Sequence, residues 1–186
     1  SLGFPNRGLD FAACQLEQNQ GNTGSSPVVV SVSGATIDEI VSCHRRIEPL
    51  VDATEINISS PNTAGLRIFQ DPSTLTELLD RLNEGRNKRL FVKLPTYGHS
   101  TGSTHVETDS RDRVLEMVRI CVNHGVDALT VANSWPTQHT GLAMGVGGVS
   151  GKMIFSEMLR MVTEIKTEVG SKVAINACGG IFTGED

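Results

Sequence analysis

The sequence predicts a parallel α/β fold of the TIM-type (β/α)8 barrel kind, incomplete in this chain. Two observations predict this class. Apolar strand-like runs alternate with amphipathic helical patterns, and polar residues follow each run at its C-terminal end. Active sites of β/α barrels lie at that end of the strands, whereas an open doubly wound sheet would gather its polar residues at one switch point. We therefore expect five consecutive strands of a barrel.

Length and composition fit one ordinary globular domain, with 186 residues, 38% hydrophobic content and a net charge of -5. We expect residues 1–186 to be a single barrel fragment, truncated at both ends. The chain opens without a methionine and stops at Gly184-Glu185-Asp186, where the start of a helix is expected. The acidic balance and the lack of a basic stripe argue against a nucleic-acid partner. The chain has no apolar run long enough to cross a bilayer and no signal-peptide pattern.

The first apolar run is Val28 to Val32, and a helix follows it. Thr36 and Glu39 have the spacing of a capping box, and the apolar positions from Ile37 to Ile47 form one stripe. This pattern predicts a helix that opens at Thr36.

The second run, Ala53 to Ile58, leads through a loop rich in proline, asparagine and glycine to Asp71-Pro72. Aspartate is a favoured N-cap, and proline suits the first helical position. We therefore expect a helix from Asp71 through Leu82.

The third run, Arg89 to Leu94, is followed by Pro95 to Thr108, a polar stretch without periodicity that predicts a long loop. A helix is expected from about Ser110 to His124. Gly125 is well placed to end that helix in a left-handed cap.

The fourth run is Val126 to Ala132, and a glycine-rich loop comes after it. A helix is expected from about Met153 to Val169, ended by Gly170. Lys172 to Ala177 is the fifth run, and it leads directly into Cys178-Gly179-Gly180.

The segment Asn57-Ile58-Ser59-Ser60-Pro61-Asn62 places amides and hydroxyls at the end of the second run. These groups both donate and accept hydrogen bonds, which suits a planar, amide-bearing ligand. Pro61 biases Ser60 to an extended backbone and so helps to hold its hydroxyl in one direction, as proton handling requires. The alternative is an ordinary turn between strand and helix, and composition alone favours the turn.

Lys93 ends an apolar run and precedes Leu94-Pro95, so its amine is expected at the barrel mouth. A fixed cation there could stabilise an anionic cofactor or intermediate. The alternative is a strand-end lysine that reaches solvent. Asn133-Ser134 repeats the pairing of amide and hydroxyl after the fourth run, again with a turn as the alternative.

Two glycine-rich segments predict anion sites. Gly147-Gly148-Val149-Ser150-Gly151-Lys152 precedes a helix, and Cys178-Gly179-Gly180 follows the fifth run. Glycines let backbone amides approach an anion closely, which suits a phosphate-bearing cofactor. Neither segment has the GxGxxG or P-loop pattern, so NAD and ATP are not favoured.

The histidines lack metal-ligand spacing, and we assign them no chemistry. His44 and His124 are expected at surface or edge positions of helices, and His99 and His105 in the long polar loop. The four cysteines lie far apart in the sequence, which predicts reduced thiols and neither a zinc site nor a disulfide framework.

Taken in this order, the sequence segments described above resemble those of the dihydroorotate dehydrogenases. The resemblance runs through all five predicted strands, and its first piece is distinctive. Five ordered matches outweigh the turn and loop interpretations that hold for each piece alone. The matching pieces are Asn57-Ile58-Ser59-Ser60-Pro61-Asn62-Thr63-Ala64-Gly65-Leu66-Arg67, Phe91-Val92-Lys93, Asn133, Gly147-Gly148-Val149-Ser150-Gly151 and Gly179-Gly180-Ile181.

The resemblance implies a β/α barrel that carries FMN and oxidises dihydroorotate to orotate in pyrimidine (UMP) biosynthesis. Ser60 falls at the position of the family's catalytic base, which takes the C5 proton while hydride moves from C6 to flavin N5. Lys93 matches the lysine beside the flavin ring, where a cation offsets negative charge on the reduced cofactor. The substrate-binding positions are matched by Asn57, Asn62, Asn133 and Ser134, and the backbone contacts to FMN by Ser150, Gly151, Gly179 and Gly180.

The resemblance leaves the electron acceptor open between a quinone and fumarate. A serine at Ser60, followed by residues 63–67, resembles the quinone-reducing, membrane-associated class. Residues 30–34 and 93–97 resemble the soluble, fumarate-reducing class, in which cysteine is the usual base. The location is correspondingly cytoplasmic, or peripheral on the inner membrane through segments outside this chain, and a homodimer stays open.

The sequence departs from the family pattern at two positions. Ser31 stands where the quinone-reducing class has asparagine, and Ala132 precedes Asn133 where threonine is expected, so two flavin contacts are changed. Five strands also leave a barrel whose edges have no partner.

Other functions remain open. A related flavin barrel could act on another dihydropyrimidine or on dihydrouridine. A lysine at a barrel strand end is also compatible with a Schiff-base lyase that uses Lys93. A third alternative is a non-catalytic barrel that binds a phosphorylated ligand.

Overall fold

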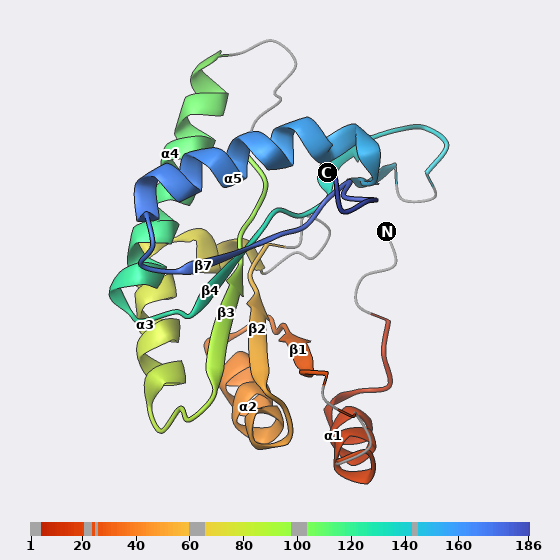
Figure 1. Cartoon of the computed structure of the whole chain (residues 1–186), viewed down its shortest axis with the longest axis vertical. Helices are drawn as coiled ribbons and strands as arrows, with labels where there is room; N and C mark the ends of the chain where they lie inside the picture. Colours follow the sequence, from red (N-terminus) through yellow and green to blue (C-terminus); the bar gives the residue numbers. More distant parts are fainter. Residues whose placement is uncertain (1–4, 21–23, 25, 60–65, 98–103, 143–144) are drawn as a thin grey trace.

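The computed structural model describes residues 5–20, 24, 26–59, 66–97, 104–142 and 145–186, which form a parallel sheet with a layer of helices (Figure 1). The sheet has the strand order β1-β2-β3-β4-β7, and all neighbouring strands are parallel. Its strands are β1 (Val29–Val32), β2 (Ala53–Asn57), β3 (Arg89–Lys93), β4 (Ala128–Val131) and β7 (Ala174–Ala177).

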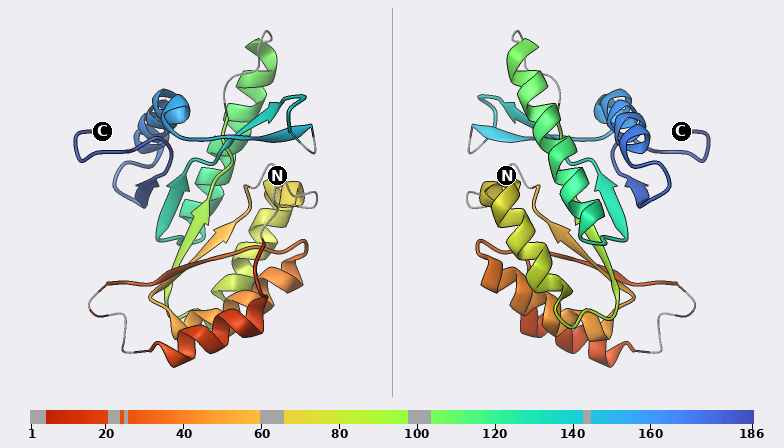
Figure 2. Two further views of the ribbon diagram at one scale, coloured as in Figure 1. Left: turned by 90° about the vertical axis from the view of Figure 1, so that its right-hand side faces the viewer. Right: turned by 90° about the vertical axis from the view of Figure 1, so that its left-hand side faces the viewer.

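The main helices are α1 (Leu9–Gln18), α2 (Ile37–Ile47), α3 (Pro72–Asn83), α4 (Thr104–Asn123) and α5 (Phe155–Val169). Three 3-10 turns accompany them: η1 (Glu48–Leu50), η2 (Leu66–Gln70) and η3 (Lys152–Ile154). Each helix from α2 to α5 contacts the next one along the chain, so these helices form one continuous layer (Figure 2). A doubly wound sheet would reverse its strand order and carry helices on both faces. The predicted barrel class is therefore confirmed.

Alternate residues of each strand divide the sheet into two faces. On the outer face, the register pairs Val32 with Ile56 and Val92 with Leu129, and all four side chains are buried beneath the helices. The inner face carries the polar residues of the same strands.

The predicted caps at Thr36, Asp71, Gly125 and Gly170 are confirmed. The Thr36 side chain accepts a hydrogen bond from the Glu39 backbone amide, and the Asp71 carboxylate accepts the amides of Ser73 and Thr74. Gly125 and Gly170 follow α4 and α5 with φ angles of 67° and 58°, in the left-handed region.

Helix α1 is not predicted, although its apolar residues have helical spacing. Leu9, Ala13 and Leu16 pack with Ile47 and Val51 in a small cluster beside the main core. The helical spacing of apolar residues was present in the sequence, but α1 is short, and its buried residues pack only in this small cluster.

The predicted start of the fourth helix is wrong, because α4 begins at Thr104 instead of Ser110. The end of the predicted loop is therefore helical, and His105 lies in α4. Residues 104–112 contain one apolar side chain, Val106, so no periodic stripe marks these first turns.

The first part of the glycine-rich segment after β4 forms one strand of a hairpin. Strand β5 (Trp135–Gln138) pairs in antiparallel fashion with β6 (Val146–Val149). A side chain at Gly148 would clash with Ser134, and one at Gly147 would lie 2.9 Å from Leu142 Cδ1. These glycines therefore allow close packing within the hairpin region.

The predicted surface position of His44 is wrong, because its side chain is 2% exposed. Its Nδ1 lies 2.9 Å from Thr54 Oγ1 on β2. Burial, opposed by Glu48, lowers the pKa of His44 and favours the neutral ring. His44, a polar residue within the apolar stripe of α2, is thus a hydrogen-bonded residue of the core.

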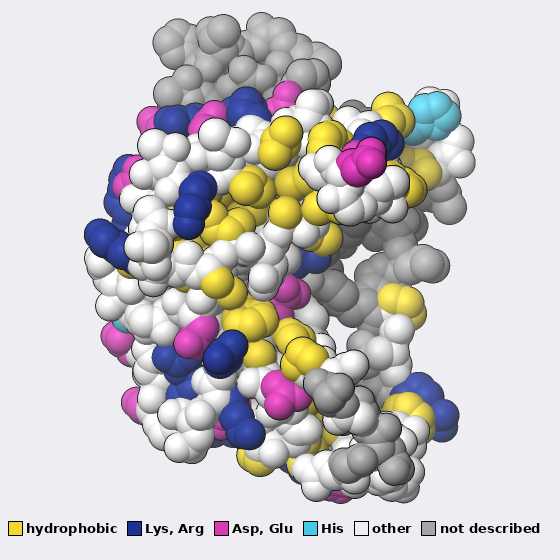
Figure 3. Space-filling model, viewed as in Figure 1, with side chains coloured by type: hydrophobic (Ala, Val, Ile, Leu, Met, Phe, Trp, Pro, Cys, Tyr) yellow, Lys and Arg dark blue, Asp and Glu magenta, His cyan; other side chains and the backbone are white. Residues whose placement is uncertain are grey.

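Strands β1 and β7 form the two edges of the sheet. Figure 3 shows hydrophobic side chains gathered on the face that carries α5 and β7. The exposed large hydrophobic residues of this region are Met153, Leu159, Ile181 and Phe182. Among the described residues, no helix has the length and apolar character needed to span a membrane.

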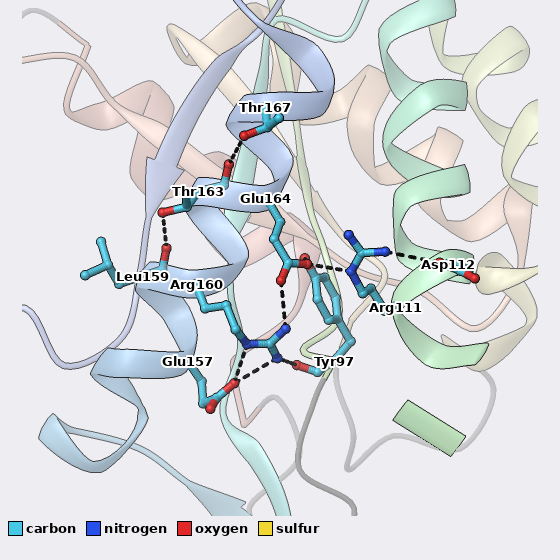
Figure 4. Close-up of polar contacts among 9 residues, drawn as sticks. All are labelled: Tyr97, Arg111, Asp112, Glu157, Leu159, Arg160, Thr163, Glu164 and Thr167. Atoms are coloured by element: carbon cyan, nitrogen blue, oxygen red, sulfur yellow. Dashed lines mark hydrogen bonds and ion pairs between the residues drawn. The ribbon is translucent and has the colours of Figure 1, made fainter. Parts of the chain in front are cut away.

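Glu164 on α5 joins three parts of the fold (Figure 4). Its carboxylate accepts hydrogen bonds from the Tyr97 hydroxyl at 3.0 Å, from Arg111 Nε at 2.7 Å and from Arg160 Nη1 at 2.9 Å. Burial opposes ionisation, but these donors together lower the pKa of Glu164. Burial and the neighbouring Glu164 raise the pKa of Tyr97. The network fixes the segment after β3 to α4 and α5.

The packing of α3 is tested by Leu78→Ala in the full-length protein. Leu78 is fully buried, so we expect the free energy of unfolding to fall by about 2–5 kcal/mol through lost burial and a cavity. Urea unfolding followed by circular dichroism measures this. The control is Glu77→Ala at the adjacent exposed position, with an expected change within about 0.5 kcal/mol. Equal effects of the two substitutions would contradict the packing of α3.

Glu164→Gln tests the carboxylate network. The pKa of Glu164 is lower in the folded chain than its ordinary value of 4.5. Its contribution to stability is therefore complete above that value and is lost as the pH falls through the lower folded pKa. We expect the stability difference between wild type and Glu164→Gln to be larger at about pH 7 than at about pH 3.

The matched control is Glu168→Gln, one turn further along α5, whose partner Arg119 is on the same α4 helix. This pair is more exposed to solvent, so we expect a smaller loss of stability. Urea unfolding at several pH values compares the variants, and a loss for Glu164→Gln no larger than the control's would contradict the role of the network.

Candidate functional site

A row of polar side chains crosses the inner face of the sheet at the C-terminal end of its strands. The register pairs Asn57 on β2 with Lys93 on β3, and Lys93 with Thr130 on β4. Register partners in parallel strands point to the same face. Lys93 is half-buried, and its side-chain amine forms no hydrogen bond or ion pair with any residue that the structure describes.

Ser59 connects the ends of β2 and β4. Asn133 Nδ2 donates to Ser59 Oγ at 2.8 Å, and Ser59 Oγ donates to Asn57 Oδ1 at 2.9 Å. The Ser59 backbone amide also donates to Asn57 Oδ1, at 3.2 Å. Because β3 lies between β2 and β4, this bridge spans the strand that carries Lys93. The structure thus brings the predicted Asn57 and Asn133 together.

The backbone of Asn133 is held by Thr96, a residue that sequence reasoning missed. Thr96 Oγ1 donates to the Asn133 carbonyl at 2.8 Å and accepts from its amide at 3.2 Å. The Ser134 amide donates to Asn133 Oδ1 at 2.7 Å. The hydroxyl of Ser134 faces the hairpin, where Gly148 makes room for it. Asn133 is therefore fixed through both its main chain and its side chain.

Glu55 is a second residue that was missed. Its carboxylate accepts from Ser31 Oγ at 2.9 Å and from Thr130 Oγ1 at 2.6 Å, so it links three strands across the inner face. The available signal was a carboxylate inside a strand pattern, two positions before Asn57 and therefore on the same face.

The predicted glycines converge at one junction. A Cβ at Gly180 would lie 2.7 Å from the Gly151 carbonyl oxygen, and one at Gly179 would lie 2.8 Å from Ile154 Cδ1. The φ angles of Gly151, Gly179 and Gly180 are 82°, 137° and 74°. Ser150 is exposed beside them. Within the described part of the chain, the amides of Gly179 and Gly180 donate to no other residue.

A cavity of about 730 Å³ opens at the β1 edge of the sheet, where residues of both faces and of α2 line it. Ser31, Ser33 and Asn57 line it from the sheet, and Arg7 and Phe11 line it from the N-terminal segment and α1. A volume of this size is in the range of small-molecule and cofactor sites.

Two predicted site residues, Ser60 and Asn62, lie outside the described residues. Ser60 directly follows Ser59, whose side chain is 4% exposed. Among the described residues, no cluster of histidine, cysteine, aspartate or glutamate could hold a metal ion. The four cysteines are free.

Known proteins resemble this chain along its whole length. A dihydroorotate dehydrogenase from Myxococcus xanthus, described as quinone-dependent, is 28% identical over 100% of this chain and 51% of its own length. A dihydroorotate dehydrogenase A (fumarate) from Lactiplantibacillus plantarum is 30% identical over 100% of this chain and 60% of its own. The chain thus spans little more than half the length of these relatives.

The fold has a solved counterpart. The crystal structure of ligand-free DHODH from Eimeria tenella superposes with a TM-score of 0.79 and 23% identity, over 98% of this chain and 58% of that one. The family model for dihydroorotate dehydrogenase matches residues 1–186. This chain therefore belongs to the dihydroorotate dehydrogenase family.

Proposed function

We propose that the protein containing this chain oxidises dihydroorotate to orotate with FMN, and that residues 1–186 form part of one barrel domain. The observation that carries the proposal is the Ser59 bridge, which holds Asn57 and Asn133 together over the strand that bears Lys93. Family membership supports the same reaction. Asn57, Asn133 and Ser134, together with Asn62, would bind the polar edges of the substrate.

The chain offers suitable groups for FMN, which when bound accepts the hydride from the substrate. Lys93 would stand beside the flavin ring and offset negative charge there, because this half-buried cation has no partner among the described residues. The glycine junction, with Ser150 and Gly151 against Gly179 and Gly180, would direct backbone amides to the cofactor and its phosphate.

Ser60 would take the proton from C5 of the substrate. A serine hydroxyl is a weak base at its ordinary pKa, so it has to pass the proton onward or act while the substrate's acidity is raised by departure of the hydride. Its neighbour Ser59 is held by three hydrogen bonds. These hydrogen bonds hold Ser59 in place directly before Ser60, which supports the proposed role of Ser60.

The reaction is tested on the purified full-length protein. We expect it to be yellow and to lose its flavin colour when dihydroorotate is added without oxygen. A yellow protein that ignores dihydroorotate would favour another dihydropyrimidine or dihydrouridine as substrate. A colourless protein on which borohydride traps a carbonyl substrate at Lys93 would favour the Schiff-base alternative, and a colourless protein without such trapping would favour a barrel that only binds a phosphorylated ligand.

The electron acceptor is identified with the same purified full-length protein. Relatives named for quinone and for fumarate both match this chain, so the reduced protein is offered each acceptor separately and reoxidation is followed. Reoxidation by a quinone would support a peripheral location on the inner membrane, and reoxidation by fumarate a cytoplasmic one.

Ser60→Ala tests the base. We expect flavin to be retained and dihydroorotate oxidation to fall by about 10²–10⁴-fold, because general-base catalysis contributes about that much. Ser156→Ala, at an exposed position of α5, is the matched control and should keep wild-type turnover. Unchanged turnover in Ser60→Ala would remove Ser60 as the base.

A further inference from the structure

Glu55 is an acidic residue in the middle of a strand of the sheet. Its neighbours along β2, Thr54 and Ile56, are buried beneath the helices, and Glu55 itself is half-buried. Because side chains alternate along a strand, Glu55 lies on the inner face of the sheet, as Asn57 does. Carboxylates are uncommon in strands, and the burial of a charge is costly unless the charge is hydrogen-bonded. The partners of Glu55 therefore determine what it can do.

Two hydroxyl groups hold the Glu55 carboxylate, one from each side. Ser31 on β1 donates to Oε1 at 2.9 Å, and Thr130 on β4 donates to Oε2 at 2.6 Å. Both carboxylate oxygens are thus acceptors, which suits the ionised form. Within the part of the chain that the structure describes, Glu55 forms no ion pair. The two hydroxyls stabilise its negative charge without cancelling it.

The contact with Thr130 brings the carboxylate toward Lys93. Strand β3 lies between β2 and β4, so the Glu55 side chain reaches across β3 to its partner. In the register, Glu55 pairs with Phe91, and Thr130 pairs with Lys93. The Glu55 side chain therefore runs from the row of Phe91 to the row of Lys93 on the same face of the sheet. Its negative charge ends beside the strand position that carries the amine.

Glu55 and Lys93 interact through space, since the two side chains form no direct ion pair. The face that they share is the interior of a β/α barrel, where charges interact more strongly than they do in water. In the proposed function, Lys93 offsets negative charge on the flavin. A nearby anion reduces the positive potential that Lys93 supplies there.

We propose that Glu55 is a positioning residue of the flavin site: held by Ser31 and Thr130, its carboxylate opposes the positive charge of Lys93 and so lowers the reduction potential of the bound flavin. Reduction adds negative charge to the flavin, and a neighbouring anion disfavours that form. A lower potential favours transfer of the two electrons from the reduced flavin to the acceptor. The inference rests on the proposed function and adds to it a residue that sets the driving force for reoxidation.

Glu55→Gln in the full-length protein loaded with flavin tests this role. Glutamine keeps the size of the side chain, and its amide can still bond to both hydroxyls, but the charge is lost. Equilibration with a dye of known potential, without oxygen, measures the reduction potential. We expect the equilibrium to shift about tenfold toward the reduced flavin, which is the lower end of the range for neighbouring charges. For a two-electron couple, this change raises the potential by about 30 mV.

Three control variants separate the charge of Glu55 from other effects of substitution. Glu55→Asp keeps the charge and should shift the equilibrium by less than about threefold. Thr130→Val removes one of the two hydroxyl donors and leaves the charge, so it should lower stability in urea with an equally small shift of the equilibrium. Glu77→Gln removes a charge from the exposed side of α3, where solvent screens it, and should leave the potential unchanged. If Glu55→Gln does not retain flavin, Glu55→Met, which is uncharged and of similar length, takes its place with the same expected shift.

The outcomes distinguish this inference from the proposed function. An unchanged potential in Glu55→Gln would overturn the inference. A shift of the same size in Thr130→Val would also overturn it, because the effect would then come from the hydrogen bond and not from the charge. A wild type that carries flavin but does not oxidise dihydroorotate would overturn the proposed function. The potentials would still decide the role of Glu55 in that case, because equilibration with a dye needs no substrate. A protein that binds no flavin would overturn both.

Discussion

The parallel pairing of β2 with β3 and of β3 with β4 is the interaction on which the rest of the structure depends. Its register sets Asn57 and Lys93 side by side on the inner face, and it sends Ile56 and Val92 outward beneath the helices. A slip of one residue would exchange the two faces, burying the lysine among leucines and exposing the core. The same pairing of strands thus produces both the hydrophobic core and the polar site. Selection for a stable core therefore also preserves the arrangement of the site.

The sequence predicted the elements whose signals are local. Thr36 and Asp71 cap their helices as expected, and Gly125 ends α4, because capping depends on a few neighbouring residues. The start of α4 carried no periodic signal, so the sequence pattern could not place it. The buried position of His44 could not be predicted either, since it depends on Thr54 of the following strand.

In the candidate site, too, some features could be predicted from the sequence and others depend on contacts between distant segments. Strand ends and family resemblance were sufficient to name Asn57, Lys93 and Asn133 as candidates, and the structure brings them to one edge of the sheet. Sequence reasoning treated the amides as able both to donate and to accept. The structure assigns the acceptor of Asn57 to Ser59, a restriction that arises only when a side chain meets a particular backbone amide. Thr96 and Glu55 were missed for a related reason, because their partners lie on other strands.

The close approach of Gly148 to Ser134 has a consequence for how this region can change over time. No side chain fits at position 148 while a serine occupies position 134. A residue with a side chain at position 148 therefore requires a smaller residue at position 134, whereas a smaller residue at position 134 needs no change at position 148. The glycine on β6 is thus what leaves room for the serine next to Asn133, although the two positions are more than ten residues apart in the chain.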